Sequence, residues 1–217
     1  MKTILLFANF LLAIFCLHPD HSFSQVTDKD GNVYKTVTIG NQEWTSENLN
    51  VEHYRNGDAI PQVQDYEKWA KLKTGAWCWY ENNSANGKTY GKLYNWYAVN
   101  DKRGLTPEGW HIATDLEWAV MVEKIGGEKK SGDKLKSTSG WLENNLATNS
   151  SGFSALPGGI RDADGTFYDA GKFACFWTSS EANETSAVYR FLIYNYTDVA
   201  LFDGVKERGL SVRLIKD

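Results

Sequence analysis

The chain has 217 residues, a formal net charge of −4 at pH 7 and no polybasic run. We therefore expect no nucleic-acid partner and no binding to an anionic membrane surface through a basic face. Nine tryptophans and 19 glycines stand beside only four prolines. This composition predicts many turns and aromatic anchors, with short strands and ordered loops in place of long helices.

The first 24 residues predict a secretory signal peptide. Lys2 is followed by an apolar run from Ile4 to Leu17, and small residues lead up to Ser24, which is the pattern of a signal cleaved after that serine. The run is shorter than the ~20 apolar residues that span a membrane, so we expect no transmembrane segment in the mature chain. Lipid attachment at Cys16 is the alternative, although a bulky phenylalanine precedes it. Residues 25–217 then fit one domain, secreted or held at the outer cell envelope.

The first half of this domain predicts short elements separated by turns. Residues 28–32 (DKDGN) read as a hairpin turn, because Asp-Gly and Gly-Asn tolerate positive φ. The same residues resemble the beginning of a calcium loop, but no glutamate closes it at the required spacing. Three further strands are expected, over residues 33–39, 43–45 and 76–80. Residues 81–84 and Gly87 end the third of these strands. Short helices are expected over residues 65–71 and 93–97.

Residues 109–127 predict a compact helix with both ends marked. Thr114 is a good N-cap, and Glu117 three positions later completes a capping box. Gly126 supplies the stop at the other end. Four apolar residues form one stripe that needs a core to pack on: Trp118, Met121, Val122 and Ile125. We expect this helix to anchor the fold.

The second half predicts a long loop region followed by strands. Residues 128–133 read as a surface loop, and Leu135 and Trp141 bracket a further short element. Residues 149–171 are mostly turns, and a long loop of this kind inside a domain is usually functional or tied down. Strands are expected over residues 173–178, 187–194, 199–202 and 209–215, with residues 195–198 as a hairpin turn.

The mature chain keeps two cysteines and two histidines. Cys78 and Cys175 could form one disulfide or equally be two buried thiols. Cys175 lies in an apolar strand run, which favours a structural thiol, because a reactive one needs an electropositive, partly exposed setting. With only His53 and His111, a histidine-rich zinc site is not expected. His111 could act as a general base, but its place beside Trp110 favours packing or hydrogen bonding.

Several segments, taken in order, resemble one family. They are VYKTVTIGNQEWTSENLN (residues 33–50), TGAWCWYENN (74–83), YGKLYNWYAV (90–99), TPEGWHIATDLEW (106–118), GFSALPGGIRDADGTF (152–167), FWTSSE (176–181) and GLSVRLIKD (209–217). This set resembles the Fibrobacter succinogenes major paralogous domain, found in exported proteins and lipoproteins of the Bacteroidetes and Fibrobacteres. The resemblance implies no settled biochemical activity.

The family is itself similar to C-type-lectin-like folds and to the formylglycine-generating sulfatase-modifying group. In both, a P-x-G-W-[HR]-L-P-[ST]-x-x-E-W segment opens a helix, and a glycine-rich loop region precedes terminal strands that end in a G-[FY]-x-[VL]-R-C pattern. The residues at those places here, to which the resemblance assigns structural roles, are Trp110, Glu117, Trp118, Gly209, Val212 and Arg213. The family usually has cysteines where this chain has Thr106 and Leu214. If relatives join those cysteines, this domain replaces the bridge with core packing.

Calcium is a possible cofactor. Asp162 and Asp164, followed by a glycine in the long loop region, could supply oxygen ligands, with Asn195 and Asp198 as neighbours from the hairpin turn. The simpler interpretation is two β-turns whose Asp and Asn side chains bind their own backbone. The sugar-binding signatures of C-type lectins are absent, which favours turns.

A sugar-binding surface is the other candidate site. Exposed tryptophan and tyrosine rings stack on sugars, and nearby Asn and Asp side chains bind hydroxyl groups. Tyr194, Asn195, Tyr196 and Asp198 are close enough in sequence to form such a patch, and Trp141 could join it from another loop. The alternative is that the tryptophans simply form the core.

The sequence therefore predicts an α+β domain in a C-type-lectin-like arrangement, with short helices around a twisted, mostly antiparallel sheet. We expect a non-enzymatic function, recognition of a glycan or of another envelope or extracellular protein. The alternatives are an enzyme related to the formylglycine-generating group, and a purely structural envelope component. No Ser-His-Asp, H-E-x-x-H or phosphate-loop pattern occurs in the sequence.

Overall fold

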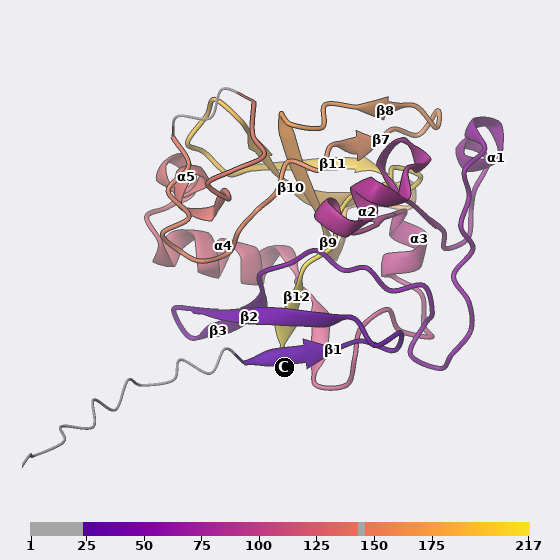
Figure 1. Ribbon diagram of the computed structural model, residues 1–217, viewed down its shortest axis with the longest axis horizontal. Helices are drawn as coiled ribbons and strands as arrows, with labels where there is room; N and C mark the ends of the chain where they lie inside the picture. Colours follow the sequence, from indigo (N-terminus) through magenta and orange to yellow (C-terminus); the bar gives the residue numbers. More distant parts are fainter. Residues whose placement is uncertain (1–23, 143–145) are drawn as a thin grey trace, which may run out of the picture.

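The computed structural model describes residues 24–142 and 146–217. The predicted signal peptide, with Cys16, lies outside these residues except for Ser24. Antiparallel strand pairs make up the named sheets, and short helices surround them (Figure 1). The α+β class is therefore confirmed. No helix in the described part of the chain is both long and apolar enough to cross a membrane.

A five-stranded sheet joins the two ends of the described chain. Its strand order is β1 (Gln25–Thr27), β2 (Val33–Ile39), β3 (Gln42–Thr45), β12 (Leu214–Lys216) and β6 (Trp110–Ile112). The predicted turn between β1 and β2 is confirmed, because the Asp28 carboxylate accepts hydrogen bonds from the amides of Asp30 and Asn32, both at 2.9 Å. Its other oxygen accepts from Asn32 Nδ2 at 2.8 Å, so this carboxylate serves the turn.

A second sheet contains β9 (Phe173–Glu181), β10 (Ser186–Ile193) and β11 (Ala200–Val205), with β10 in the middle. These three strands were predicted. The strand expected over residues 209–215 forms only at its end, because residues 209–211 make single bridges to Arg161, Tyr94 and Phe176 before β12 begins. Each of these three residues bridges to a different strand, so the segment pairs continuously with none of them.

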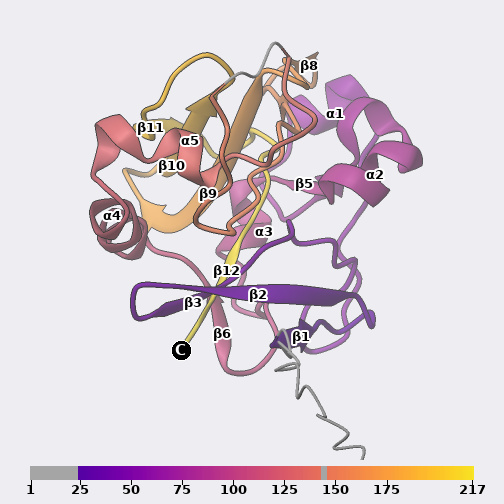
Figure 2. The same cartoon turned by 60° about the vertical axis from the view of Figure 1, so that its left-hand side comes forward.

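Helix α4 (Asp115–Lys124) packs against β9 and β10 (Figure 2). The predicted capping box is present: Glu117 N donates to Thr114 Oγ1 at 3.2 Å, and Thr114 N donates to Glu117 Oε2 at 2.7 Å. Trp118 is fully buried, and its ring lies 5.3 Å from Trp44 and 5.2 Å from Phe153. The helix therefore anchors a core that also includes Met121, Val122 and, at its edge, Ile125.

Short elements fill the rest of the described chain. The helices are α1 (Tyr66–Ala70), α2 (Ser84–Tyr90), α3 (Trp96–Val99) and α5 (Gly132–Leu135), and the 3₁₀ turns are Tyr80–Asn82 and Glu128–Lys130. Two ribbons pair β4 (Trp77–Cys78) with β5 (Leu93–Tyr94) and β7 (Ile160–Arg161) with β8 (Phe167–Tyr168).

Three of the predicted short elements need correction, and one helix was not predicted. The helix expected over residues 93–97 begins only at Trp96, because Leu93 and Tyr94 pair with β4. Strand β4 is shorter than expected. Helix α5 ends at Leu135, where a new element was expected to begin. Helix α2 was missed because Gly87 reads as a break, but the Trp79 indole occupies the space a Cβ there would need, 2.2 Å away.

Two buried arginines hold the long loop region, residues 149–171. Arg213 donates to Asn48 Oδ1 at 2.6 Å and to the carbonyls of Thr45, Phe153 and Ser154. Arg161 donates to four carbonyls, those of Val63, Gln64, Asp65 and Gly165. Neither guanidinium has a carboxylate among these partners, so both satisfy buried backbone acceptors. The expected structural role of Arg213 has this geometric basis.

Candidate binding cleft

A polar cleft of 460 Å³ lies between segments that are distant in sequence. They are the loop before β4, helix α3 with the turn after it, the end of β9 and the turn after β11. Its lining residues are Lys73, Thr74, Gly75, Trp96, Tyr97, Asn100, Asp101, Lys102, Arg103, Glu181 and Lys206. Concave sites with a few converging polar groups are where small polar ligands usually bind.

One asparagine positions two walls of this cleft. Asn95, which is buried, caps α3 by accepting from Ala98 N at 3.1 Å. The same oxygen accepts from Ala76 N at 2.9 Å, and its Nδ2 donates to Thr74 O at 2.8 Å. Because all three bonds come from one side chain, α3 and the loop before β4 are held in fixed relation.

Tyr97 presents the aromatic surface of the cleft. It is half-buried, and its hydroxyl donates to Glu207 Oε1 at 3.0 Å. Lys73 forms an ion pair with the same carboxylate. Burial raises the pKa of Glu207, but the bonds from Lys73 and Tyr97 outweigh this effect and hold the pKa below its usual value. Glu207 is thus ionised and fixes both neighbours.

The turn after α3 holds a bidentate ion pair. Arg103 Nε lies 2.9 Å from Asp101 Oδ1, and its Nη2 lies 2.7 Å from Oδ2. Hydrogen bonding from Arg103 lowers the pKa of Asp101 to about 2. The guanidinium also contacts Asp58 at 3.2 Å and lies 3.9 Å above the Tyr54 ring. The Arg103 side chain is therefore held between two carboxylates and one aromatic ring.

Gly75 lets a buried hydroxyl approach the cleft wall. A Cβ at this position would lie 2.0 Å from Tyr54 Oη and 2.9 Å from the Cα of Ala98. The Tyr54 hydroxyl is buried and makes no hydrogen bond of good geometry, although Asp101 and Arg103 are close enough to affect its ionisation. Burial, with the charge of Asp101, raises the pKa of Tyr54 to about 12. Close packing thus requires glycine at position 75, next to Tyr54 Oη, which lacks a hydrogen-bond partner.

The last wall is formed by Lys206 and Glu181. The Lys206 side chain is only 7% exposed, and its ammonium forms an ion pair with Glu181. It also donates to Glu184 O at 2.8 Å and lies 4.8 Å from the Trp96 ring. The buried amine is therefore neutralised by one carboxylate at the rim of the cleft.

The predicted sugar patch is only partly at the surface. Asn195 is exposed and Tyr196 is 55% exposed, whereas Tyr194 is half-buried and packs against the core. Asp198 lies 3.7 Å from Lys129. Trp141 does come close to this turn, but its ring is only 8% exposed and belongs to the core, so it presents no stacking face.

A lysine beneath this turn explains how Trp141 and the hairpin are connected. Lys136 is buried, and its ammonium donates to the carbonyls of Tyr194 at 3.1 Å and Tyr196 at 2.5 Å. The same nitrogen lies 5.3 Å from the Trp141 ring. Burial lowers the pKa of Lys136 to about 8. The turn thus rests on an amine that has no carboxylate among these partners.

The two candidate calcium ligands occupy the β7–β8 turn. Asp162 Oδ1 accepts from Ala163 N in the turn and also from the distant Arg208 Nε, both at 2.8 Å, and Asp164 Oδ1 accepts from Thr166 N at 2.8 Å. This geometry is that of the simpler interpretation, turns stabilised by their own side chains. Within residues 24–142 and 146–217, no group of three His, Cys, Asp or Glu side chains could hold a metal ion. The hairpin residues Asn195 and Asp198 contribute no third carboxylate to such a group.

The two cysteines are buried in the core, and both ring nitrogens of His111 contact carboxylates of the fold. Cys78 and Cys175 are buried free thiols in separate core clusters. Burial raises the pKa of Cys78 to about 12 and also raises the pKa of Cys175. His111 contacts two carboxylates, with Nδ1 2.6 Å from Asp217 and Nε2 2.8 Å from Glu117. Both ring nitrogens are therefore engaged within the fold.

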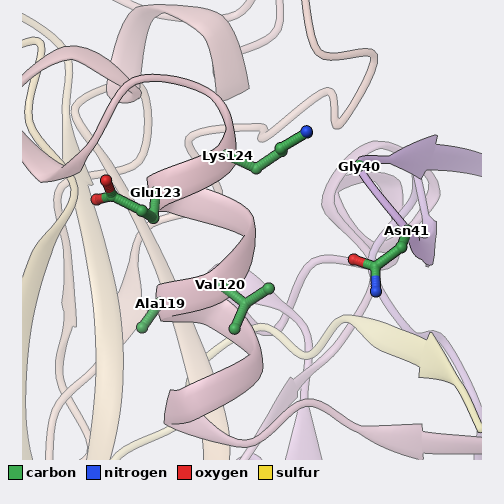
Figure 3. A pocket seen from close by; sticks show the side chains of 6 residues that line it. All are labelled: Gly40, Asn41, Ala119, Val120, Glu123 and Lys124. Carbon is green, nitrogen blue, oxygen red and sulfur yellow. The ribbon is translucent and has the colours of Figure 1, made fainter.

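A second hollow, of 790 Å³, lies between the outer side of α4 and the β2–β3 turn. Figure 3 shows Ala119 and Val120 on the helix, with Gly40 and Asn41 across from them. Val120 is 45% exposed, and Leu116 one turn earlier is 73% exposed. This groove is mainly apolar and lacks the converging polar groups of the cleft. The cleft is therefore the better candidate for a small polar ligand.

The described residues define an α+β domain of antiparallel sheets and short helices with a polar cleft assembled from four segments. The chain belongs to the Fibrobacter succinogenes major domain family, whose model matches residues 37–216. This confirms the resemblance seen in the sequence motifs. No curated protein and no solved structure matches the chain.

Proposed function

We propose that the chain is an exported, non-enzymatic binding domain that recognises a glycan in the polar cleft, either secreted or at the outer cell envelope. The observation that carries this proposal is the half-buried Tyr97 ring beside a fixed set of amide, carboxylate and cationic groups. A C-type-lectin-like arrangement of the fold is part of the same proposal.

The chemistry of the lining suits a sugar. A sugar hydroxyl both donates and accepts hydrogen bonds, and it is best bound where carboxylate acceptors stand beside cationic donors. Asp101 and Arg103 supply such a pair, and Asn100 adds an exposed amide. The apolar face of a pyranose ring packs against an aromatic ring, for which Tyr97 is available.

The thiols favour a binding function over the enzyme alternative. An enzyme of the formylglycine-generating type needs a reactive cysteine, and a reactive cysteine has a lowered pKa and partial exposure. Cys78 and Cys175 have the opposite properties. A surface protein is the second candidate ligand, favoured by the apolar groove beside Val120 and Leu116, since exposed apolar patches often mark protein contacts.

A glycan array probed with residues 25–217, with calcium and with chelator, tests the proposal. Asn100→Ala and Tyr97→Ala should each abolish or strongly weaken saturable binding. Tyr196→Ala is the matched control in the predicted hairpin patch and should bind as the unchanged protein does. Loss with Tyr196→Ala alone would move the site to the hairpin. A blank array in both conditions would refute glycan recognition and direct the search to protein partners.

A further inference from the structure

The charges around the cleft balance one another. Four cations line it: Lys73, Lys102, Arg103 and Lys206. Four carboxylates accompany them, Asp101 and Glu181 in the lining and Glu207 and Asp58 each bonded to a lining cation. The whole chain, by contrast, carries a net charge of −4. The cleft is therefore locally neutral, although it is dense in charged groups.

We infer that the cleft selects an uncharged saccharide, whose hydroxyl groups bind across its ion pairs, and that it discriminates against acidic and amino sugars. This inference rests on the proposed function and names the ligand class for the same site. The selectivity arises because the charged groups of the cleft already have partners of opposite charge.

To bind any lining cation other than Lys102, an acidic sugar would have to take that cation from its partner. Glu207 is only 12% exposed and Asp101 only 20% exposed. If a ligand carboxylate captured Lys73 or Arg103, it would leave one of these carboxylates poorly solvated and unpaired. Leaving a buried charge without its partner is costly. The exposed Lys102, which forms no ion pair among the described residues, could attract an acidic ligand only in solvent, where the interaction is weak.

An amino sugar would also have to displace a charged group from its partner, but in this case the displaced group is a cation. Its ammonium group would compete with Lys206 for Glu181, and Lys206 is almost completely buried. The displaced amine would keep only the Glu184 carbonyl as an acceptor. A neutral hydroxyl avoids both costs, because it can donate to a carboxylate and accept from the neighbouring cation while the pair stays together.

The test compares three sets of tetrasaccharides by titration calorimetry. The first contains glucose, mannose or galactose, the second the same rings with a carboxylate at C6, and the third the 2-amino-2-deoxy rings. The neutral members that bind should lose at least tenfold in affinity on either substitution. Their binding should also change little between low and high salt, because no net charge is neutralised.

Variants that unbalance the cleft provide the decisive comparison. Glu181→Gln leaves Lys206 without a carboxylate but keeps its bond to Glu184 O, and this rim side chain is 52% exposed, so the fold should persist. Its affinity for the C6-carboxylate set should rise about tenfold relative to the neutral set. Glu67→Gln, on the exposed side of α1 with a side chain 87% exposed, is the matched control and should change neither.

The outcomes separate the two levels of the proposal. Equal or tighter binding of the acidic or amino sugars by the unchanged protein would overturn the selectivity while leaving glycan recognition intact. An unchanged preference in Glu181→Gln would also overturn it, because charge balance would then not set the choice. Failure of every saccharide to bind would refute the proposed function itself.

Discussion

The Nε2 atom of His111 lies 2.8 Å from the carboxylate of Glu117, the residue that closes the capping box of α4. The other ring nitrogen lies 2.6 Å from Asp217, just beyond β12. Only the imidazolium can donate to both carboxylates at once. One side chain thus joins β6, the beginning of α4 and the end of the five-stranded sheet, and the strength of this link depends on its protonation.

His111 should make the stability of the fold depend on pH. Burial lowers the pKa of His111, but the bonds to Asp217 and Glu117 outweigh this effect and raise the pKa above 6.5. Since the folded-state pKa is raised, this contribution is fully present below about pH 6.5 and is lost as pH rises through the folded-state value. Urea unfolding of the unchanged protein and of His111→Gln at pH 5.5, 7 and 8.5 should show a difference that shrinks as pH increases. A difference independent of pH would contradict the role.

Arg213 should be required for stability in a way that lysine cannot replace. Its guanidinium binds four acceptors from two distant parts of the chain, residues 45–48 and 153–154, whereas an ammonium at the end of a lysine cannot reach the same fork of acceptors. Arg213→Lys should lower the free energy of unfolding by about 3 kcal/mol, because buried carbonyls lose their donors. Chemical denaturation measures this loss.

The control for Arg213 is a cation that makes little contact. Lys71 has a side chain 79% exposed, and its ion pair with Glu67 is long, at 3.9 Å. Lys71→Met should change the free energy of unfolding by less than about 0.5 kcal/mol. Equal effects of the two substitutions would show that Arg213 has no special place in the core.

Gly75 and Tyr54 should be energetically coupled. The Cβ of Gly75→Ala would overlap with Tyr54 Oη and press on the backbone of Ala98, so we expect destabilisation by about 1 to 3 kcal/mol. Tyr54→Phe removes a buried hydroxyl that lacks a hydrogen bond of good geometry, and it should be nearly neutral. In the double variant the ring no longer carries the clashing oxygen, and part of the loss should return.

A double-mutant cycle measures that coupling. Recovery in the double variant is expected to be partial, because the contact with Ala98 remains. Strictly additive losses would mean that the hydroxyl moves freely away from Gly75. The close approach at the cleft wall would then not explain why glycine is needed there.

The sequence predicted those parts of the fold whose signals are local. Helix α4 has its cap, its apolar stripe and its stop within a few residues, and strands β9 to β11 alternate with clear turns. Helix α2 was missed because tolerance of Gly87 depends on Trp79, a contact made in three dimensions. The family was predicted from motif order, and the match over residues 37–216 confirms it.

The cleft could not be predicted in this way. Lys73, Asp101 and Lys206 are brought together by crossings between elements, and no spacing in the sequence indicates that they converge. The one local signal is the polar run at residues 100–103, just beyond the helix expected over residues 93–97, and a run of this kind is equally typical of a solvated turn. The composition also does not predict which tryptophans are buried. From the sequence, Trp141 fits a surface position as well as a core position, and the structure places it in the core.

The two cysteines should be unreactive in the folded protein. Both are buried, and in an apolar setting the thiolate that attacks an electrophile is disfavoured, as the raised pKa values of Cys78 and Cys175 indicate. Iodoacetamide at pH 8 should therefore label neither residue in native protein within the time that labels both in urea. Mass spectrometry of the labelled peptides distinguishes Cys78 from Cys175. Rapid native labelling of one cysteine would revive the enzyme alternative, since it would reveal a nucleophile that the described structure conceals, and that residue would become the first to mutate.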